Sequence, residues 1–200
     1  MRILFHSPIL RDYPVTQKSW FSLRKEDIEI DYFLNRDKTF LGDVKYLNVA
    51  FKMNQAREIV LRRGYDYLFN VEHDIVLPHM ALTKLKLVNA EVVSGLYRLR
   101  PGAVGHNNFA FRIPDPLGPQ DADDRWIELD KDFHYGEVIH CSHISFGCIL
   151  ISREVLKKIR FNKDIDVSFS HKCRELNIPL LVHTGVRCGH IEANNTIIYA

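Results

Sequence analysis

The chain has 200 residues, 46% of them hydrophobic, so it is long enough to bury one core and short for two independent ones. Its 27 Lys and Arg residues nearly balance its 25 Asp and Glu residues, which gives no reason to expect nucleic-acid binding. No apolar segment has the length of a membrane span, and the first residues (MRILFHSPILRDYP) are a poor signal peptide. We therefore expect a single domain over residues 1–200 that is cytoplasmic, has no membrane span, and is a monomer or a weak homodimer.

The spacing of the cysteines disfavours two kinds of site. Cys141, Cys148, Cys173 and Cys188 form no C-x-x-C pair, which disfavours a thiolate zinc site or a redox motif. We expect buried thiols. A disulfide between two of them stays open, because intracellular proteins of hyperthermophiles do contain such bridges.

The first hundred residues alternate between short apolar runs and amphipathic stretches. The apolar runs are rich in Ile, Leu, Val and aromatic residues, which is typical of buried strands. The longest amphipathic stretch places Val49, Met53, Ala56 and Val60 on one stripe and ends at Gly64, as a helix does. The predicted strands are residues 2–5, 28–35, 65–71 and 90–99, and the predicted helices are residues 48–64 and 79–89.

The pattern breaks between residues 101 and 139, where Pro, Gly, Asn and Asp are dense. We expect an irregular region with a small antiparallel excursion, of the kind that often faces substrate. Regular pattern then returns as a strand, two helices and a strand, at residues 144–152, 153–159 (with Ser152 as N-cap), 167–177 and 179–186. Alternating strands and helices predict an α/β fold, with a mostly parallel central sheet and helices on both faces.

An acidic triplet, Glu72-His73-Asp74, follows the predicted strand at 65–71. Ligands of open α/β sheets collect at the carboxyl ends of strands, and two carboxylates at one turn can converge on one cation. Mg²⁺ and Mn²⁺ accept one or two protein carboxylates and take further ligands from water and a substrate diphosphate. Taken alone, however, an acid at a strand end is better explained as a solvated turn residue or a helix cap.

Three residues near the end of the sequence offer the same chemistry. Asp166 precedes a predicted helix, where an N-cap would explain it, and Asp164 suits a surface turn. His190 follows the last predicted strand, and imidazole is a borderline ligand that suits Mn²⁺. Ordinary packing would explain this histidine as well.

Four segments, taken in order, resemble the glycosyltransferases of GT-A fold: YDYLFNVEHDIVLP, AEVVSGLYR, ISFGCILISREVLKKI and DIDVSFSHKCRELNIPLLVHTGVRCGHI. Members of that family carry an Asp-x-Asp metal motif at a strand end, an aspartate that opens a later helix, and a His after the last strand. The resemblance covers residues 1–100 and 140–191 and implies a single-domain GT-A fold. It divides the chain into a nucleotide-sugar half (1–99), an irregular acceptor-side region (100–140) and a catalytic and acceptor half (141–200).

The resemblance implies transfer of a sugar from a UDP- or GDP-sugar to a hydroxyl of a glycan, protein or lipid. Glu72, Asp74 and His190 would hold Mn²⁺ or Mg²⁺, with Asp74 as the more direct ligand, and Asp166 would be the catalytic carboxylate. Glu72 stands where the family has Asp, so it contacts either the ion or the sugar.

A second departure concerns the catalytic carboxylate. The family usually has an acid immediately before it, whereas Ile165 precedes Asp166 here. This leaves Asp164 as an alternative catalytic residue.

Further residues are assigned by their place in the pattern. Five of them follow the first strands, project from the helix at 48–64 or lie inside the triplet, where a nucleotide-sugar would bind: Ser7, Asn35, Asp37, Arg57 and His73. Three are assigned to the acceptor side, since aromatic faces suit sugars, although packing explains each of them as well or better: Tyr97, Trp126 and Ser145.

Three alternatives remain. A sugar nucleotidylyltransferase shares the architecture, but it needs a Gly-rich loop after the first strand, and HSPILRDYP has no glycine. A non-catalytic sugar-nucleotide-binding protein is disfavoured by the intact acids at both positions. A metal-dependent hydrolase is disfavoured because these acids fit one ion better than a metal pair.

Overall fold

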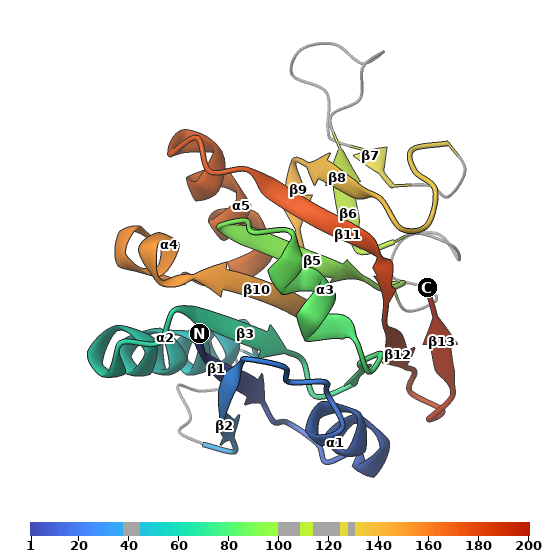
Figure 1. The fold of residues 1–200 in the computed structure, drawn as a ribbon, viewed down its shortest axis with the longest axis horizontal. Coiled ribbons are helices and arrows are strands. Elements are labelled where there is room, and N and C mark those ends of the chain that lie inside the picture. Colours follow the sequence, from blue (N-terminus) through green and yellow to red (C-terminus); the bar gives the residue numbers. More distant parts are fainter. Residues whose placement is uncertain (38–44, 100–108, 114–124, 128–130) are drawn as a thin grey trace.

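The structure is a computed structural model and describes residues 1–37, 45–99, 109–113, 125–127 and 131–200. Within these ranges the chain forms five helices and thirteen strands (Figure 1). The helices are α1 (Pro14–Phe21), α2 (Lys45–Arg63), α3 (Ala81–Leu87), α4 (Arg153–Lys158) and α5 (Ile165–Glu175). The strands are β1 (Arg2–Pro8), β2 (Glu29–Asn35), β3 (Tyr67–Val71), β4 (Ile75–Val76), β5 (Val92–Leu96), β6 (Phe111–Ile113), β7 (Arg125–Trp126), β8 (Val138–Cys141), β9 (His143–Ile144), β10 (Cys148–Ser152), β11 (Leu180–Arg187), β12 (Gly189–Ile191) and β13 (Ile197–Tyr199).

Seven of the described strands form a central sheet in the order β2-β1-β3-β10-β5-β11-β8. Strands β2, β1, β3, β5 and β11 share one direction, while β10 and β8 run antiparallel to their neighbours. Two small antiparallel sheets, β13-β12-β4 and β7-β6-β9, complete the architecture. The expected α/β class, with a mostly parallel central sheet and a small antiparallel addition, is confirmed.

Helices cover both faces of this sheet. Helices α1 and α3 lie on the front face in Figure 1, where Trp20 of α1 packs against Phe5 of β1 at 5.5 Å between ring centroids. Helices α2 and α5 lie behind, where Phe146 and Phe169 pack edge to face at 5.1 Å. Because both faces are covered, every residue of β5 and β10 is buried, as expected for central strands.

Local signals in the sequence explain several element ends. Gly64 ends α2 with a φ of 70°, a conformation that glycine adopts at little cost. The Ser152 hydroxyl accepts a hydrogen bond from the Val155 N–H at 3.3 Å, so the predicted N-cap of α4 is confirmed. The N-cap prediction for Asp166 is wrong: α5 begins at Ile165, so Asp164 occupies the N-cap position and Asp166 lies inside the first turn.

The sequence did not predict α1. This helix buries only Thr16 and Trp20, one turn apart, and therefore shows no extended apolar stripe. Its start at Pro14 is a common helix N1 residue. The cysteines agree better with expectation: all four are free thiols, and Cys148, Cys173 and Cys188 are buried.

An irregularity near the end of β11 redirects the chain. The pairing register between β11 and β5 shifts between His183 and Arg187, as at a β-bulge. The chain then pairs as β12 with β4, the short strand that follows the acidic triplet. Such a shift turns the chain and re-aims its side chains, and here it brings His190 beside Asp74.

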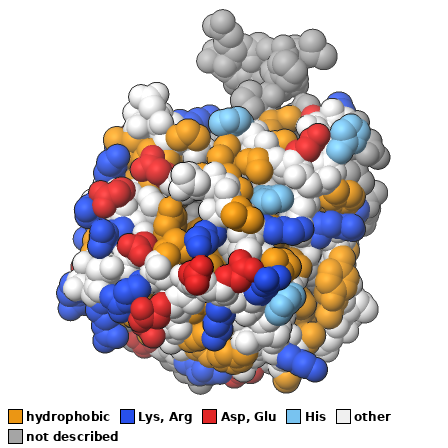
Figure 2. Space-filling model, viewed as in Figure 1, with side chains coloured by type: hydrophobic (Ala, Val, Ile, Leu, Met, Phe, Trp, Pro, Cys, Tyr) orange, Lys and Arg blue, Asp and Glu red, His pale blue; other side chains and the backbone are white. Residues whose placement is uncertain are grey.

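Two surface properties also bear on function. Acidic and basic side chains are interspersed on the face shown in Figure 2, so neither sign dominates it. Among the helices of the described residues, none combines the length and the apolar character needed to cross a membrane.

Candidate functional site

A cavity of about 690 Å³ lies where β1 and β3 end, opposite β12 and the first turn of α5. Ligands of α/β sheets bind at this kind of position. The lining combines acids, histidines and apolar residues from both halves of the chain: Pro8, Leu10, Tyr13, Val49, Glu72, His73, Asp74, Asp164, Ile165, Asp166, Val167 and His190.

The charges in this cavity have one sign. Four carboxylates line it, from Glu72, Asp74, Asp164 and Asp166, and the described residues place no Lys or Arg in the lining. An anionic ligand such as a diphosphate would be repelled by these walls unless a cation accompanied it. The cavity therefore suits a cation, or an anion that arrives together with one.

The acidic triplet forms a tight turn between β3 and β4. The Glu72 N–H donates to the Gly147 carbonyl at 3.0 Å, and the Ile75 N–H donates back to the Glu72 carbonyl at 3.1 Å. The first bond ties the turn to the segment that precedes β10. Both acids of the triplet consequently reach the cavity, and the side chain of Asp74 is buried.

Asp74 and His190 lie beside each other in the cavity. The His190 Nε2 lies 3.7 Å from the Asp74 Oδ2, and the Ile191 N–H donates to the Asp74 carbonyl at 2.9 Å. The other ring nitrogen of His190, Nδ1, lies 2.8 Å from the Arg98 carbonyl oxygen. A carbonyl only accepts, so Nδ1 donates to it, and Nε2 is the ring nitrogen that faces Asp74.

This pair fits a hard divalent cation. A carboxylate oxygen and an imidazole nitrogen face each other at a distance too long for a direct hydrogen bond, and the Arg98 carbonyl holds the other ring nitrogen. The described residues contain no group of three or more His, Cys, Asp or Glu side chains gathered around one point. Mg²⁺ and Mn²⁺ often take only one or two protein ligands and complete their shell with water and phosphate oxygens, so a two-residue anchor suffices.

Asp166 is a carboxylate of a different kind. Burial raises its pKa from 3.8 to about 7, against the opposing effect of a hydrogen bond from the Ser145 hydroxyl. A carboxyl group with a pKa near neutrality can take a proton from a substrate hydroxyl and release it again. Asp164 also lines the cavity, but it is exposed. The environment thus distinguishes the two acids that the sequence left as alternatives.

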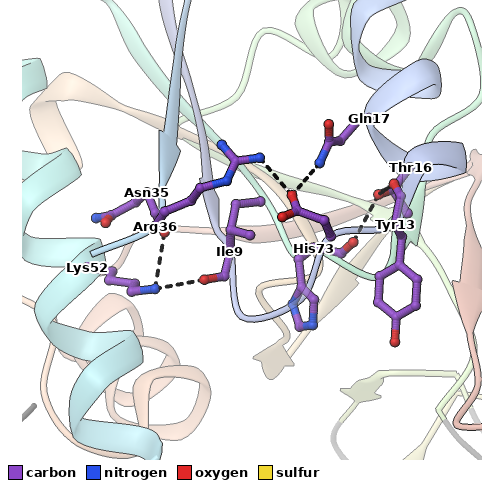
Figure 3. Close-up of polar contacts among 9 residues, drawn as sticks. Ile9, Tyr13, Thr16, Gln17, Asn35, Arg36, Lys52 and His73 are labelled. Atoms are coloured by element: carbon purple, nitrogen blue, oxygen red, sulfur yellow. Dashed lines mark hydrogen bonds and ion pairs between the residues drawn. The ribbon is translucent and has the colours of Figure 1, made fainter. Parts of the chain in front are cut away.

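The residues assigned to nucleotide binding at the end of β2 do not line the cavity. Asn35 is buried and its side chain donates to the Gln55 side-chain oxygen at 2.8 Å, while its side-chain oxygen accepts from the Asp37 N–H at 3.1 Å. The Lys52 ammonium donates to the carbonyls of Asn35 (3.1 Å) and Ile9 (3.0 Å), which joins the ends of β1 and β2 (Figure 3). These residues hold the loop that enters the cavity.

That loop carries Tyr13, a residue that the sequence analysis missed. Its ring stacks on His73 with 5.8 Å between centroids, and the Thr16 hydroxyl donates to the His73 carbonyl at 3.0 Å (Figure 3). Asp12, next to Tyr13, accepts from Arg36 at 2.7 Å. The stacked pair gives the cavity an aromatic wall, and only its position after β1, at a strand's carboxyl end, signals it in the sequence.

Two other donor-side assignments lie elsewhere. Arg57 is used within the fold, because its Nε donates to the carbonyls of Leu156 (2.7 Å) and Ile159 (3.0 Å) and its Nη1 pairs with Glu58. Ser7 is buried and does not line the cavity, and its hydroxyl has no hydrogen-bond partner among the described residues.

The acceptor-side assignments also change. Tyr97 is 4% exposed and lies under the cavity rather than in its wall, with its hydroxyl accepting from the Gly147 N–H at 3.0 Å. Ser145 does not line the cavity, although it lies near enough to Asp166 to lower the pKa of that carboxyl group. Trp126 belongs to β7, and its side chain lies outside the described part of the structure.

Several lining residues were not predicted because they are apolar: Pro8, Leu10, Val49, Ile165 and Val167. Apolar residues in strands and helices normally predict core positions, and only the folded structure reveals that these face a cavity. Ile165 is the clearest case, since it stands between the two candidate acids.

No protein-family model matches the chain, and no curated protein is similar to it. Among solved structures, the chain is similar to the crystal structure of A197 from STIV, with 20% sequence identity and a TM-score of 0.64 over 99% of this chain and 93% of that one. It is also similar to a UDP-glucose pyrophosphorylase from Acinetobacter baumanii, with 10% identity and a TM-score of 0.44 over 86% of this chain and 61% of that one. The first similarity shows a common fold, and the second is too remote to support any argument.

Proposed function

We propose that this protein is a metal-dependent glycosyltransferase of the GT-A type, which moves a sugar from a UDP- or GDP-sugar to an acceptor hydroxyl of a glycan, protein or lipid. The observation that carries the proposal is that three groups meet in one cavity. They are the side chains of Asp74 and His190, which lie beside each other, and the carboxyl group of Asp166, whose pKa is near neutrality. The sequence resemblance supports the same assignment of roles.

Asp74 and His190 would hold Mn²⁺ or Mg²⁺ beside the donor diphosphate. When bound, the cation supplies positive charge for the diphosphate oxygens as that group departs. The four carboxylates of the cavity cannot supply such charge, and the described lining holds no Lys or Arg. Glu72 lies next to this pair and would contact either the cation or the sugar hydroxyls.

Asp166 would act as the base. Its ionised carboxylate takes the proton of the acceptor hydroxyl while the acceptor oxygen forms a bond to the anomeric carbon. The bond between that carbon and the diphosphate oxygen breaks, and its electron pair leaves with the diphosphate. A single displacement of this kind inverts the anomeric configuration. Ser145 keeps the carboxylate oriented, and the Tyr13 and His73 wall offers a flat surface to the donor.

A donor panel tests this proposal. Binding of UDP- and GDP-sugars is measured by calorimetry with and without Mn²⁺, and turnover is measured as released UDP or GDP. Asp74→Asn should abolish Mn²⁺-dependent donor binding, and Asp166→Asn should keep donor binding but lose turnover. Glu175→Gln, at the exposed far end of the helix that carries Asp166, is the matched control.

The outcomes separate the alternatives. Donor binding without turnover by the unmodified protein with any acceptor would favour a sugar-nucleotide-binding protein. Release of pyrophosphate from a nucleoside triphosphate and a sugar phosphate would favour a nucleotidylyltransferase. Absence of both donor binding and turnover across the panel would refute the proposal.

A further inference from the structure

Helix α1 lies against the turn that carries the acidic triplet, and three of its side chains bond to the backbone there. Residues three and four positions apart share one face of a helix, so Thr16, Ser19 and Trp20 point the same way. The bonds, each 3.0 Å long, run from the Thr16 hydroxyl to the His73 carbonyl, from the Trp20 Nε1–H to the Ile75 carbonyl, and from the Leu77 N–H to the Ser19 hydroxyl. Alternate residues of the segment 73–77 are therefore fixed to α1.

Thr16 holds the residue of this segment that lies inside the triplet (Figure 3). Its side chain is fully buried, and its hydroxyl lies within hydrogen-bond distance of two carbonyls, those of His73 (3.0 Å) and Tyr13 (2.8 Å). The Tyr13 carbonyl also accepts from the N–H groups of Thr16 and Gln17, so it keeps donors when the hydroxyl is removed. What the hydroxyl adds to the fold is the bond to His73.

The His73 carbonyl belongs to the peptide group that joins His73 to Asp74. A peptide group is planar, so a bond that holds its oxygen also fixes the direction in which the chain enters Asp74. On the other side of this residue, the Asp74 carbonyl accepts from the Ile191 N–H at 2.9 Å. The two peptide groups that flank Asp74 are thus held from opposite sides, one by α1 and the other by β12. Together they direct its buried carboxylate toward His190.

We propose that Thr16 is a positioning residue for Asp74 and acts through the peptide group between His73 and Asp74. The proposal rests on the proposed role of Asp74 as a ligand of Mn²⁺ or Mg²⁺. Groups that orient a metal ligand typically change the affinity for the metal by ten- to a hundredfold. Without the hydroxyl, this peptide group can tilt, and the carboxylate of Asp74 can turn away from the imidazole of His190.

A pair of substitutions at residue 16 tests the proposal. Thr16→Val replaces the hydroxyl by a methyl group of similar size, and we expect the Kd for Mn²⁺ to rise about tenfold in a calorimetric titration with the metal alone. Thr16→Ser keeps the hydroxyl and should bind Mn²⁺ as tightly as the wild type. A Thr16→Val variant with the wild-type Kd would overturn the proposal.

Ser19→Ala is the matched control, because it removes a neighbouring bond of α1 to the same segment. That bond holds the Leu77 N–H, on the far side of β4 from Asp74. In urea unfolding without metal, Thr16→Val and Ser19→Ala should each lower the folding equilibrium constant, by about tenfold. Ser19→Ala should nevertheless keep the wild-type Kd for Mn²⁺. If α1 only stabilised the fold, the two variants would bind Mn²⁺ equally well, and that result would overturn the role of Thr16.

Failure of this inference can be told apart from failure of the proposed function. Suppose the wild type binds Mn²⁺, Asp74→Asn abolishes the binding, and Thr16→Val leaves it unchanged. Only the role of Thr16 is then overturned, and the metal site stands. Binding of Mn²⁺ that survives in Asp74→Asn would overturn the role of Asp74 and this inference with it. A wild-type protein that neither binds Mn²⁺ nor turns over any donor would overturn the proposed function as well.

Discussion

Asp166 provides the sharpest prediction, because the feature that makes it a suitable base also destabilises the fold. Its pKa is raised from 3.8 to about 7, so the folded protein holds its proton more tightly than the unfolded chain does. When folding raises the pKa of an acid, the stability of the protein is highest below the unfolded-state pKa and falls as pH rises toward the folded-state pKa. Above pH 7 the ionised, half-buried carboxylate has its full destabilising effect.

The magnitude follows from the pKa values. At about 1.4 kcal/mol for each pKa unit, a rise from 3.8 to about 7 corresponds to up to about 4 kcal/mol. Asp166→Asn keeps the shape and an oxygen for the Ser145 hydroxyl but removes the charge. We therefore expect the variant to be more stable than the wild type at pH 8, by up to about 4 kcal/mol, and nearly equal to it near pH 4.

Urea unfolding between pH 4 and pH 8.5 measures this difference. The fluorescence of Trp20, which is fully buried, is a suitable probe, and EDTA prevents trace metal from stabilising the ionised carboxylate. Asp164→Asn is the matched control: it removes an exposed carboxylate two residues away and should change stability by no more than about 0.5 kcal/mol at any pH. An Asp166→Asn variant no more stable than the wild type at pH 8 would refute the reasoning.

Three further predictions concern the surroundings of the site. His190→Ala should weaken Mn²⁺ binding at least about tenfold in a calorimetric titration with the metal alone. A variant that binds Mn²⁺ as tightly as the wild type would show that the imidazole is not a metal ligand. Gly147→Ala should lower the free energy of unfolding by about 1–3 kcal/mol in urea, because the new methyl group would overlap the Tyr97 ring; a neutral result would mean that the ring has room to move. Arg57→Met should lower it by about 1–3 kcal/mol through the loss of two bonds to backbone carbonyls. In the same variant the affinity for the donor should equal that of the wild type, and a higher Kd would indicate that Arg57 contacts the donor.

The sequence predicted the α/β class and most elements because apolar periodicity reports which face of a segment is buried. It could not predict α1, whose two buried residues leave no stripe, nor the β4 and β12 pairing, which joins two very short strands. Pairing between remote short segments depends on how the whole chain folds, and no local pattern encodes it.

Within the site, the residues with distinctive chemistry were easier to identify than the rest. Glu72, Asp74, Asp166 and His190 all reach one cavity, as expected from their positions after strands or at a helix start. Arg57 does not line this cavity and bonds to backbone carbonyls, because a long side chain on a helix can reach the neighbouring backbone as easily as a ligand. Burial, which separates Asp166 from Asp164, is a property of the folded chain alone.

The pairing of β4 with β12 has a consequence for how the protein matures. Asp74 comes from the first half of the chain and His190 from its last residues, so the two meet only when β12 pairs with β4. Contacts between such distant segments form late, since a long loop must first be closed. If the pair holds Mn²⁺ as proposed, a partly folded chain would lack this affinity, and Mn²⁺ binding would appear only late in refolding.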